Sequence, residues 1–287
     1  MSPVCHICGE AAVLYTKKHE YTFYRCPHCL LIFLHPLPSL ASTRTFYSEE
    51  YFRGKKPGFG YANYETDKRP MRPAFLAYLA ILKEHAPDFG TLLDVGTSTG
   101  YFLKLAKEAG WNALGLEISP YAARIGQEAG LNIQNGTLEE VELPVESLTA
   151  ITGFDVFEHL LDPHAFLEKA KSLLTYGGLL CINTPTADSL WARFWGKKWQ
   201  AILPPEHTML YNSKNIVRIL EAHGFEILHL GKIPKRFTLS YIARMIYLWR
   251  GWKLFLWLSA TLSRSRLRNL SIPLNVRDNV FVLARKK

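Results

Sequence analysis

The sequence of 287 residues lacks an uninterrupted apolar run long enough to cross a bilayer. Its most apolar stretch, residues 239–262, is interrupted by Arg244, Arg250 and Lys253, whereas a span needs about 20 apolar residues. The chain also has no internal repeat and no low-complexity tract, which argues against a solenoid or a disordered protein. We therefore expect a globular protein with room for one α/β domain and a small addition.

Acidic residues are in the minority, because 25 Asp and Glu face 34 Lys and Arg and leave a formal net charge of +9. This balance favours anionic partners such as nucleic acid, phosphorylated sugars or a lipid surface, and selects none of them. No charged segment followed by an apolar core opens the chain, so we predict a cytoplasmic protein. Residues 239–262 contain Trp, Arg and Lys, and can alternatively bind peripherally at the inner membrane surface.

Cysteine is scarce, and four of the five cysteines stand in two close pairs. Cys5 and Cys8 form one pair, and Cys26 and Cys29 form the other after a gap of 17 residues. In a reducing compartment this spacing predicts a zinc site rather than disulfides. Four thiolates fill a tetrahedral shell and leave no position for a reacting water, so we predict a structural Zn²⁺. Cys181, in a predicted central strand, is expected to be a small buried apolar residue.

Stretches typical of strands and of helices alternate from residue 91 to the end of the chain, which predicts βαβ units and a parallel sheet. The predicted strands are 91–96, 112–118, 132–134, 148–153, 178–184, 225–231 and 279–286. The predicted helices are 74–85, 101–109, 120–129, 163–174 and 213–223. We expect three parts: a zinc-binding module at 1–38, a linker or lid at 39–73, and an α/β domain at 74–287 with a helical insertion at about 238–270. Tyr61 and Tyr64 of the linker can close over a substrate.

The segment from Asp94 to Gly100 carries the clearest signal of a ligand site. It places an acid at the end of a strand, then small residues in a tight turn, then a helix. Ligands bind in the crevice beyond the carboxyl ends of parallel strands, and small residues let the backbone approach them closely. Glu117, 23 residues after Asp94 at the end of the next strand, is placed to accept the two hydroxyls of a ribose.

The same turn does not fit a dinucleotide-binding dehydrogenase. That class needs G-x-G-x-x-G, whereas the three positions here hold Gly96, Ser98 and Tyr101. A pyrophosphate would therefore lose its backbone cradle. An acid before the first glycine suits instead a cofactor whose charged end is an amino acid, because Asp94 can orient an ammonium group.

These residues resemble class I S-adenosylmethionine-dependent methyltransferases, whose usual D-x-G-x-G-x-G motif has glycine where this chain has Ser98. A closer similarity is to bacterial zinc-containing methyltransferases of sugar, polysaccharide and natural-product pathways. It rests on the cysteine pairs followed by LIFLHPLP, and on YSEEYF, FDVFEHLLDP, INTPT and PPEHTMLYN. The resemblance implies a Rossmann-like α/β fold, mostly parallel with an antiparallel last strand, and a small zinc-ribbon-like module. It also implies methyl transfer to a small molecule, which is a sugar, a glycan intermediate or a secondary metabolite. A sugar acceptor can be nucleotide-linked or lipid-linked.

The resemblance further implies which residues hold S-adenosylmethionine. Those expected at its methionine end and ribose are Asp94, Gly96, Ser98, Gly100 and Glu117. Those expected around the adenine and beneath the cofactor are Ile118, Thr137, Leu138, Phe154 and Asp155.

A hydroxyl or a carbon acid needs a general base before it can accept the methyl group, and histidine can take a proton near neutral pH. His159 follows the fourth strand of the α/β domain, and Glu206 and His207 follow the fifth. Sugar C-methyltransferases share a Glu-His pair late in the chain. We favour His207 as the base because it lies in a predicted loop, over Glu206 and over His159, which can equally be structural.

Two other functions stay open. An RNA methyltransferase would suit the charge of +9 and an N-terminal zinc module. However, the fourth strand ends in Gly-Phe-Asp rather than in the Asn/Asp-Pro-Pro-aromatic motif of enzymes that methylate base amino groups, so nucleic acid is not the expected partner. A membrane-surface enzyme acting on a lipid-linked substrate would use residues 239–262, for which a buried helical cap is the first expectation.

Overall fold

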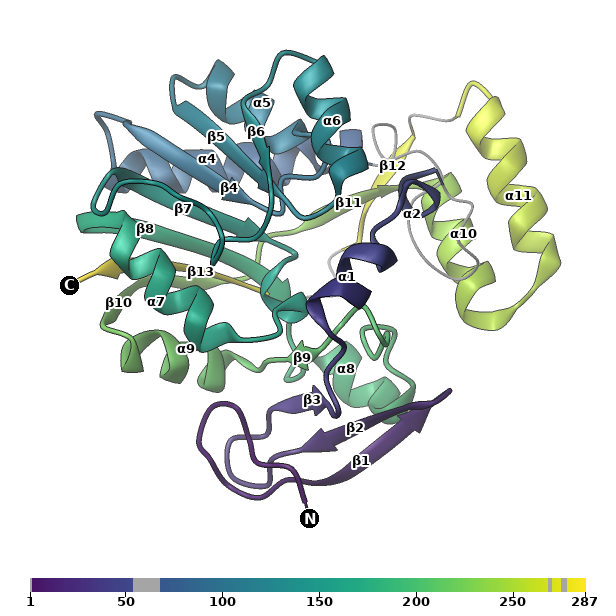
Figure 1. Cartoon of the computed structure of the whole chain (residues 1–287). Coiled ribbons are helices and arrows are strands. Elements are labelled where there is room, and N and C mark those ends of the chain that lie inside the picture. The colour runs from purple at the N-terminus through teal and green to yellow at the C-terminus, as the bar shows by residue number, and fades with distance from the viewer. Residues whose placement is uncertain (1, 54–67, 268–269, 275–277) are drawn as a thin grey trace.

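The computed structural model describes residues 2–53, 68–267, 270–274 and 278–287, and is built around a seven-stranded sheet (Figure 1). From edge to edge its strands are β10 (Phe225–Gly231), β13 (Asn279–Lys286), β8 (Leu174–Pro185), β7 (Leu148–Phe154), β4 (Thr91–Val95), β5 (Asn112–Glu117) and β6 (Ile133–Asn135). Strand β13 is antiparallel to both its neighbours, and the pairs from β8 to β6 are parallel. The predicted sheet, mostly parallel with an antiparallel last strand, is confirmed.

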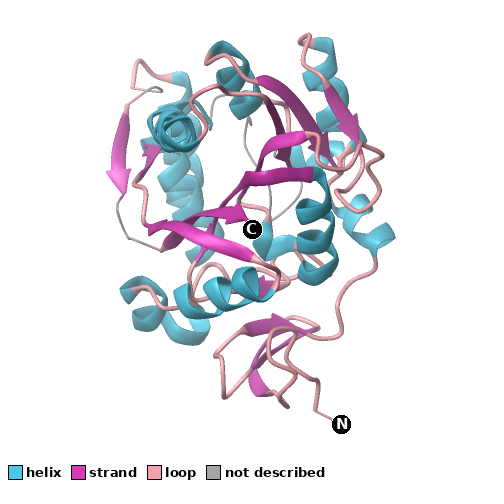
Figure 2. Ribbon diagram, turned by 90° about the vertical axis from the view of Figure 1, so that its left-hand side faces the viewer, coloured by secondary structure: helices cyan, strands magenta, loops and turns pink. Residues whose placement is uncertain are grey.

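Helices cover both faces of this sheet, as Figure 2 shows. Leu92 packs with the helices on one face, and the next residue, Leu93, packs with those on the other. Strand β4 is therefore an apolar run rather than an alternating pattern. Cys181 of β8 is fully buried on the face of Leu92, as predicted. That face carries α4 (Arg72–His85), α5 (Tyr101–Glu108) and α6 (Pro120–Glu128), and the other carries α7 (Pro163–Leu173) and α9 (Ser213–Ala222).

Short polar side chains fix the first residues of α7 and α9. The Asp162 carboxylate accepts the N–H groups of His164 and Ala165 at 2.9 and 3.0 Å. Asn212 and Asn215 cap α9 reciprocally. Such caps stabilise a helix start by about 1 kcal/mol each. They also fix the ends of the two loops that precede these helices, and those loops carry the candidate catalytic side chains.

The N-terminal cysteine module is built on a second sheet, which it shares with the α/β domain. The strands of this sheet are β1 (Val13–Lys18), β2 (Tyr21–Arg25), β3 (Ile32–Leu34) and β9 (Met209–Leu210). Strand β9 follows β8 in the chain and pairs antiparallel with β3, with Phe33 opposite Met209. The N–H of Leu34 also donates to the carbonyl of Thr208 at 2.8 Å. Backbone hydrogen bonds thus attach the module to the loop after β8, which the sequence did not predict.

The first described part of the expected linker, residues 39–53, is helical and packed. It forms α1 (Leu40–Phe46) and α2 (Glu49–Phe52). Tyr51 and Phe52 are buried and pack against Ala122 of α6. These helices therefore lie along the α/β domain. Tyr61 and Tyr64, which we expected to close over a substrate, are outside the described residues.

The predicted helical insertion before the last strand is a hairpin of two helices (Figure 1). These are α10 (Leu239–Arg250) and α11 (Lys253–Arg264), and the strands that flank them, β11 (Lys235–Thr238) and β12 (Ser271–Leu274), pair antiparallel. Across the described residues, every helix is too short or too polar to span a membrane. The remaining short elements are η1 (Arg69–Met71), η2 (Phe157–His159), α8 (Leu190–Trp195) and η3 (Gly196–Lys198).

Candidate active site

The loop after β4 is a tight turn built from residues with left-handed backbone. The φ angles of Gly96, Ser98 and Gly100 are +68°, +55° and +87°, and Gly100 begins α5. A residue with a Cβ atom loses about 1–2 kcal/mol in this conformation. Ser98 adopts this left-handed backbone conformation, so serine is compatible with the turn at the middle position of the motif.

Space as well as conformation requires glycine in this turn. A Cβ atom on Gly96 would lie 2.4 Å from Cγ2 of Val156, and one on Gly100 would lie 2.2 Å from Cδ1 of Leu131. Val156 follows β7, and Leu131 precedes β6. The turn is thus pressed against residues next to the neighbouring strands, at the carboxyl edge of the sheet.

Glu117, at the end of β5, is joined to this turn. Its two carboxylate oxygens accept the N–H groups of Ser98 and Ser119, both at 2.8 Å. The residue is only 5% exposed, and burial raises the pKa of Glu117 to about 7, although the two N–H groups oppose the shift. A buried carboxylate with a raised pKa next to a glycine turn is typical of a ligand site.

Asp94, the last acid before the turn, is equally buried. Its Oδ1 accepts the hydroxyl of Thr152 from the adjacent strand β7 at 2.7 Å. Burial raises the pKa of Asp94 to about 7, and the hydrogen bond from Thr152 opposes the shift. Two acidic groups therefore lie at the ends of neighbouring parallel strands, in the arrangement that the sequence predicted.

The other predicted cofactor residues also lie at the carboxyl edge of the sheet. Ile118 is half-buried directly after β5, and Leu138 is buried after β6. The side chain of Asn135 donates to the Glu117 and Ile118 carbonyls at 2.7 and 3.1 Å and ties these two loops together. The remaining three members of the predicted set, at the same edge, are Thr137, Phe154 and Asp155.

Phe154 belongs as much to the core as to the edge. Its ring stacks on Tyr78 of α4 at a centroid distance of 4.4 Å and meets Phe102 of α5 edge-on at 4.8 Å. Asp155, the next residue, has a φ angle of +56° and accepts the side-chain N–H of Asn183 at 3.0 Å. The chain thus turns sharply after β7, and the following residues point toward the loop after β8.

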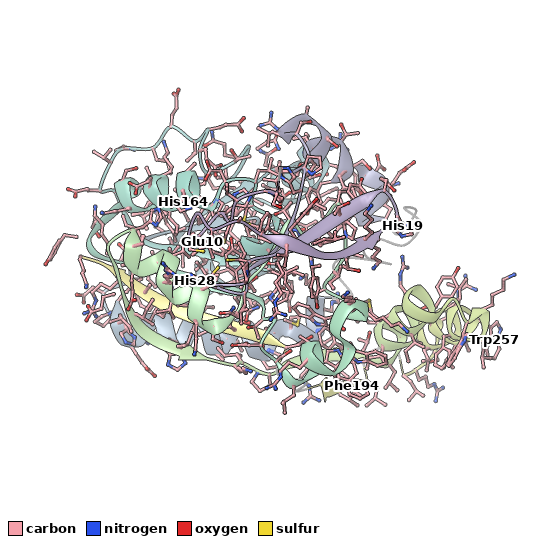
Figure 3. All side chains as sticks on the ribbon, turned by 90° about the horizontal axis from the view of Figure 1, so that it is seen from below. Glu10, His19, His28, His164, Phe194 and Trp257 are labelled. Atoms are coloured by element: carbon pink, nitrogen blue, oxygen red, sulfur yellow. The ribbon has the colours of Figure 1, made fainter. Side chains whose placement is uncertain are left out.

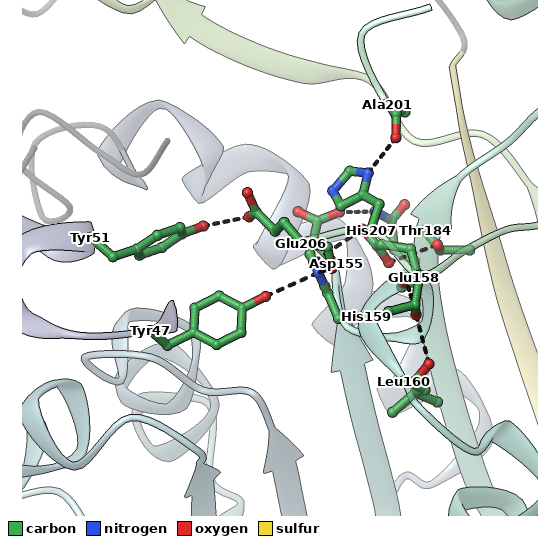
Figure 4. A network of polar contacts seen from close by, with 12 residues as sticks. Tyr47, Tyr51, Asp155, Glu158, His159, Leu160, Thr184, Ala201, Glu206 and His207 are labelled. Carbon is green, nitrogen blue, oxygen red and sulfur yellow. Dashed lines mark hydrogen bonds and ion pairs between the residues drawn. The ribbon is translucent and has the colours of Figure 1, made fainter. Parts of the chain in front are cut away.

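The candidate bases from the two loops come together beside α1 and α2 (Figure 4). The rings of His159 and His207 meet at 4.8 Å and 74°. The Nδ1 atom of His159 lies 2.7 Å from the carbonyl oxygen of Glu206 and 3.1 Å from the hydroxyl of Tyr47. The hydroxyl of Tyr51 donates to the Glu206 carboxylate at 2.6 Å. The structure therefore brings all three predicted bases into one cluster.

The environment of His207 does not suit a proton acceptor. Although part of the residue reaches the surface, burial and, to a smaller extent, the neighbouring His159 lower the pKa of His207 to about 3. An imidazole with so low a pKa binds a proton weakly and is a weak general base near neutral pH. His159 and Glu206 are the other two candidate bases in the cluster.

A small pocket adjoins this cluster, and sequence reasoning missed part of its wall. It lies between α1 and the loop after β8, and His159, Glu206 and Tyr47 line it. Tyr47 and Tyr51 were not predicted as site residues, because their contacts join segments more than 100 residues apart. The signal was present in the YSEEYF motif, which we used only for the family resemblance.

The four paired cysteines converge as their spacing predicted. Their sulfur atoms all lie within 4.8 Å of one another, and the pairs Cys5–Cys29 and Cys8–Cys26 are 3.4 Å apart. Sulfurs around one Zn²⁺ lie about 3.8 Å apart, given Zn–S bonds of about 2.3 Å. The hydrogen bond between Cys5 and Cys29 lowers the pKa of Cys5 and raises the pKa of Cys29. The donor set and its spacing fit a structural zinc ion.

A sheet in this strand order, with a glycine turn after β4 and an acid at the end of β5, is typical of the Rossmann-like methyltransferase fold. Residues 65–230 match the family model of the methyltransferase domain. The match covers more than half of the chain, which therefore belongs to this family.

Curated relatives match in part. A probable S-adenosylmethionine-dependent methyltransferase of Mycolicibacterium smegmatis is 27% identical over 141 residues, which are 47% of this chain and 52% of the relative. A ubiquinone biosynthesis O-methyltransferase of Cereibacter sphaeroides is 30% identical over 99 residues, 32% of this chain and 40% of the relative. The chain thus spans about half the length, or less, of these relatives.

Solved structures show the same fold at low identity. A methyltransferase from Thermotoga maritima has a TM-score of 0.51 and 20% identity, and covers 78% of this chain and 94% of its own. Magnesium protoporphyrin IX methyltransferase from Synechocystis has a TM-score of 0.54 and 14% identity, and covers 87% of this chain and 100% of its own. At these identities the likeness shows the fold alone.

Proposed function

We propose that this protein transfers a methyl group from S-adenosylmethionine to a small molecule: a sugar, a glycan intermediate or a secondary metabolite. The observation that carries the proposal is the hydrogen bond from the Ser98 N–H to Glu117, which joins the glycine turn to the acid of the next strand. A carboxylate has about four acceptor sites, so two N–H donors leave room for ribose hydroxyls. Asp94 would face the ammonium group of the methionine end.

S-adenosylmethionine supplies a methyl group that is activated on a sulfonium, and the chain supplies alignment and a proton acceptor. Gly96, Ser98 and Gly100 would hold the methionine end. The residues proposed around the adenine and beneath the cofactor are Ile118, Thr137, Leu138, Phe154 and Asp155. All of them lie at the carboxyl edge of the sheet, which supports a single cofactor site.

The acceptor would enter the pocket between α1 and the loop after β8. Its proton would pass to Glu206 or His159, the two titratable side chains in the pocket that are suited to take it. Tyr51 donates to Glu206, and the carbonyl of Glu206 orients His159. A small-molecule acceptor is also consistent with the Cereibacter relative, which is named for ubiquinone biosynthesis.

Calorimetric titration with S-adenosylmethionine, followed by a screen of nucleotide sugars for methyl uptake, tests this proposal. We expect saturable cofactor binding and methyl uptake by at least one sugar. Glu206→Gln and His159→Gln should lower kcat while cofactor affinity stays within about twofold, because neither side chain belongs to the proposed cofactor site. Failure of the wild-type protein to bind the cofactor at millimolar concentration would refute the proposal.

A second proposal, that the enzyme works at an anionic membrane surface, rests on the charge of the helical hairpin. Residues 232–277 hold ten of the 34 Lys and Arg residues and none of the 25 Asp and Glu. Trp252, Leu254 and Trp257 are 56%, 67% and 64% exposed. Cations beside exposed tryptophans favour the interface of an anionic bilayer, where each Lys or Arg contributes about 1 kcal/mol. A lipid-linked acceptor would then be delivered beside the site.

Co-sedimentation with vesicles of phosphatidylglycerol or of phosphatidylcholine tests the membrane proposal. The protein should bind the anionic vesicles more tightly, and Trp252→Asp with Trp257→Asp should abolish that preference. Phe194→Asp is the matched control, because Phe194 is 76% exposed and belongs to α8 rather than to the hairpin, on which Figure 3 labels Trp257. The membrane proposal is refuted if Phe194→Asp loses vesicle binding to the same extent, or if the protein retains RNA and does not bind the vesicles.

A further inference from the structure

Three side chains at the centre of the catalytic cluster converge on one point. Glu158 and His159 lie in η2, just after β7, and His207 comes from the loop after β8. One ligand atom from each of the three lies within 4.8 Å of the other two. Glu158 is only 1% exposed, and its Oε1 lies 3.8 Å from Nε2 of His159 (Figure 4). Two imidazoles and one buried carboxylate are thus gathered from loops about 50 residues apart.

The hydrogen bonds of both histidines fix which ring nitrogen carries the proton. Nδ1 of His159 lies 2.7 Å from the carbonyl of Glu206, and Nδ1 of His207 lies 2.7 Å from the carbonyl of Ala201. A carbonyl oxygen can only accept, so each Nδ1 must donate. In the neutral rings each Nε2 therefore carries a lone pair.

Glu158 is oriented in a corresponding way. The hydroxyl of Thr184 on β8 donates to its Oε2 at 2.7 Å. The N–H and hydroxyl of Thr208 both donate to its backbone carbonyl, at 2.8 and 3.0 Å. Histidines that donate their second N–H to a carbonyl, next to a carboxylate that is itself hydrogen-bonded, are typical of the outer shell of a metal site.

We propose that Glu158, His159 and His207 hold a divalent transition-metal ion, separate from the ion of the cysteine module. Two imidazoles and one carboxylate suit Zn²⁺, Fe²⁺ or Mn²⁺ better than Mg²⁺ or Ca²⁺, which prefer oxygen ligands alone. Three protein ligands leave coordination positions open for an outside oxygen. In this arrangement the ion lies beside the pocket that His159 and Glu206 line.

The role of the ion, unlike the site itself, rests on the proposed function. As a Lewis acid it would lower the pKa of an acceptor hydroxyl, and an acceptor with two adjacent hydroxyls would fill two open positions. Glu206 would take the hydroxyl proton, since His159 and His207 are engaged as ligands. The new bond joins the acceptor oxygen to the methyl carbon while the bond from that carbon to sulfur breaks, and its electron pair stays on sulfur.

Elemental analysis and Mn²⁺ titration of the full-length protein test the site. Elemental analysis counts the ions already bound, and electron paramagnetic resonance then follows the loss of free Mn²⁺, which thiolates bind poorly. In the wild type we expect one bound ion per chain in addition to any ion in the cysteine cluster. This ion is either already present after purification or is taken up during the Mn²⁺ titration. His207→Ala and Glu158→Gln should weaken this binding by at least about 100-fold. Glu206→Gln is the matched control, because its carboxylate lies outside the donor set, and it should bind Mn²⁺ like the wild type.

Cofactor affinity and the thermal midpoint of each variant show whether it remains folded. If Glu158→Gln unfolds, the ion binding of His207→Ala alone decides whether the site exists. Glu158 accepts a hydrogen bond from Thr184 of the core strand β8, whereas the His207 ring bonds to the carbonyl of Ala201 in a loop. Equal ion binding by wild type and His207→Ala, or no ion beyond the cysteine cluster in the wild type, would overturn the proposal. If the protein does not bind S-adenosylmethionine, the proposed function is refuted, but the measured ion binding still tests the metal site.

Discussion

The substitution Gly96→Ala tests whether the turn after β4 depends on close contact between backbone and side chain. Alanine at a φ of +68° should cost about 1–2 kcal/mol of unfolding free energy. Its Cβ atom would also lie 2.4 Å from Cγ2 of Val156, and overpacking of this kind costs about 1–3 kcal/mol more. We therefore expect a total loss of about 2–5 kcal/mol.

A double-mutant cycle with Val156→Ala separates the two contributions. That change removes the Cγ2 atom, so the double variant should be more stable than the sum of the single effects by about 1–3 kcal/mol. Urea unfolding followed by tryptophan fluorescence measures the stabilities, and calorimetry measures S-adenosylmethionine affinity. Gly130→Ala is the matched control, because Gly130 has a φ of +78° and a Cβ atom added there would meet no neighbouring group within 4 Å. If Gly96→Ala costs no more than Gly130→Ala, the contact with Val156 is irrelevant and the reasoning fails.

Three further predictions concern the buried acids and the cysteines. Glu117→Ala should weaken S-adenosylmethionine binding more than tenfold, about 1.4 kcal/mol or more; unchanged affinity in calorimetry would remove Glu117 from the ribose site. Burial raises the pKa of Asp94 and Glu117 to about 7. Between about pH 4.5 and 7 the folded apoprotein therefore binds more protons than the unfolded chain. These two groups make the folded protein less stable as pH rises through that window. In Asp94→Asn the thermal midpoint should fall less steeply there than in the wild type, and parallel pH profiles would contradict this. Cys8→Ser should lower both the zinc content and kcat. The kcat is measured on protein whose cofactor affinity is unchanged. Full turnover without zinc would show that the candidate active site does not depend on the cysteine module.

Much of the α/β domain could be predicted because its local signals agree with its packing. Strands β4 and β8 contain short apolar runs, at Leu92–Leu93 and Leu179–Ile182, and a strand segment that is buried on both faces requires this composition. The turn from Gly96 to Gly100 and the acid at Glu117 were found from spacing alone, since the ends of adjacent parallel strands must meet at one edge.

The acceptor side could be predicted only in part, because it depends on contacts between distant segments. His159 and Glu206 were identified by type and loop position, but Tyr47 and Tyr51 reach them from more than 100 residues away. The preference for His207 stays a prediction; burial lowers the pKa of this residue, and a single sequence does not show how deeply a loop side chain is buried. The pairing of β3 with β9 was missed since β9 is only two residues long.

The β3–β9 pairing joins the cysteine module to the loop that carries Glu206 and His207, so any effect of zinc binding on acceptor binding would have to be reciprocal. Thr208 connects them directly, because its carbonyl accepts from Leu34 of the module while its N–H and hydroxyl donate to Glu158. If zinc binding in the cysteine module lowers the free energy of acceptor binding, the bound acceptor must lower the free energy of zinc binding by the same amount. Zinc affinity would then report acceptor occupancy in a pocket whose lining contains none of the four cysteines.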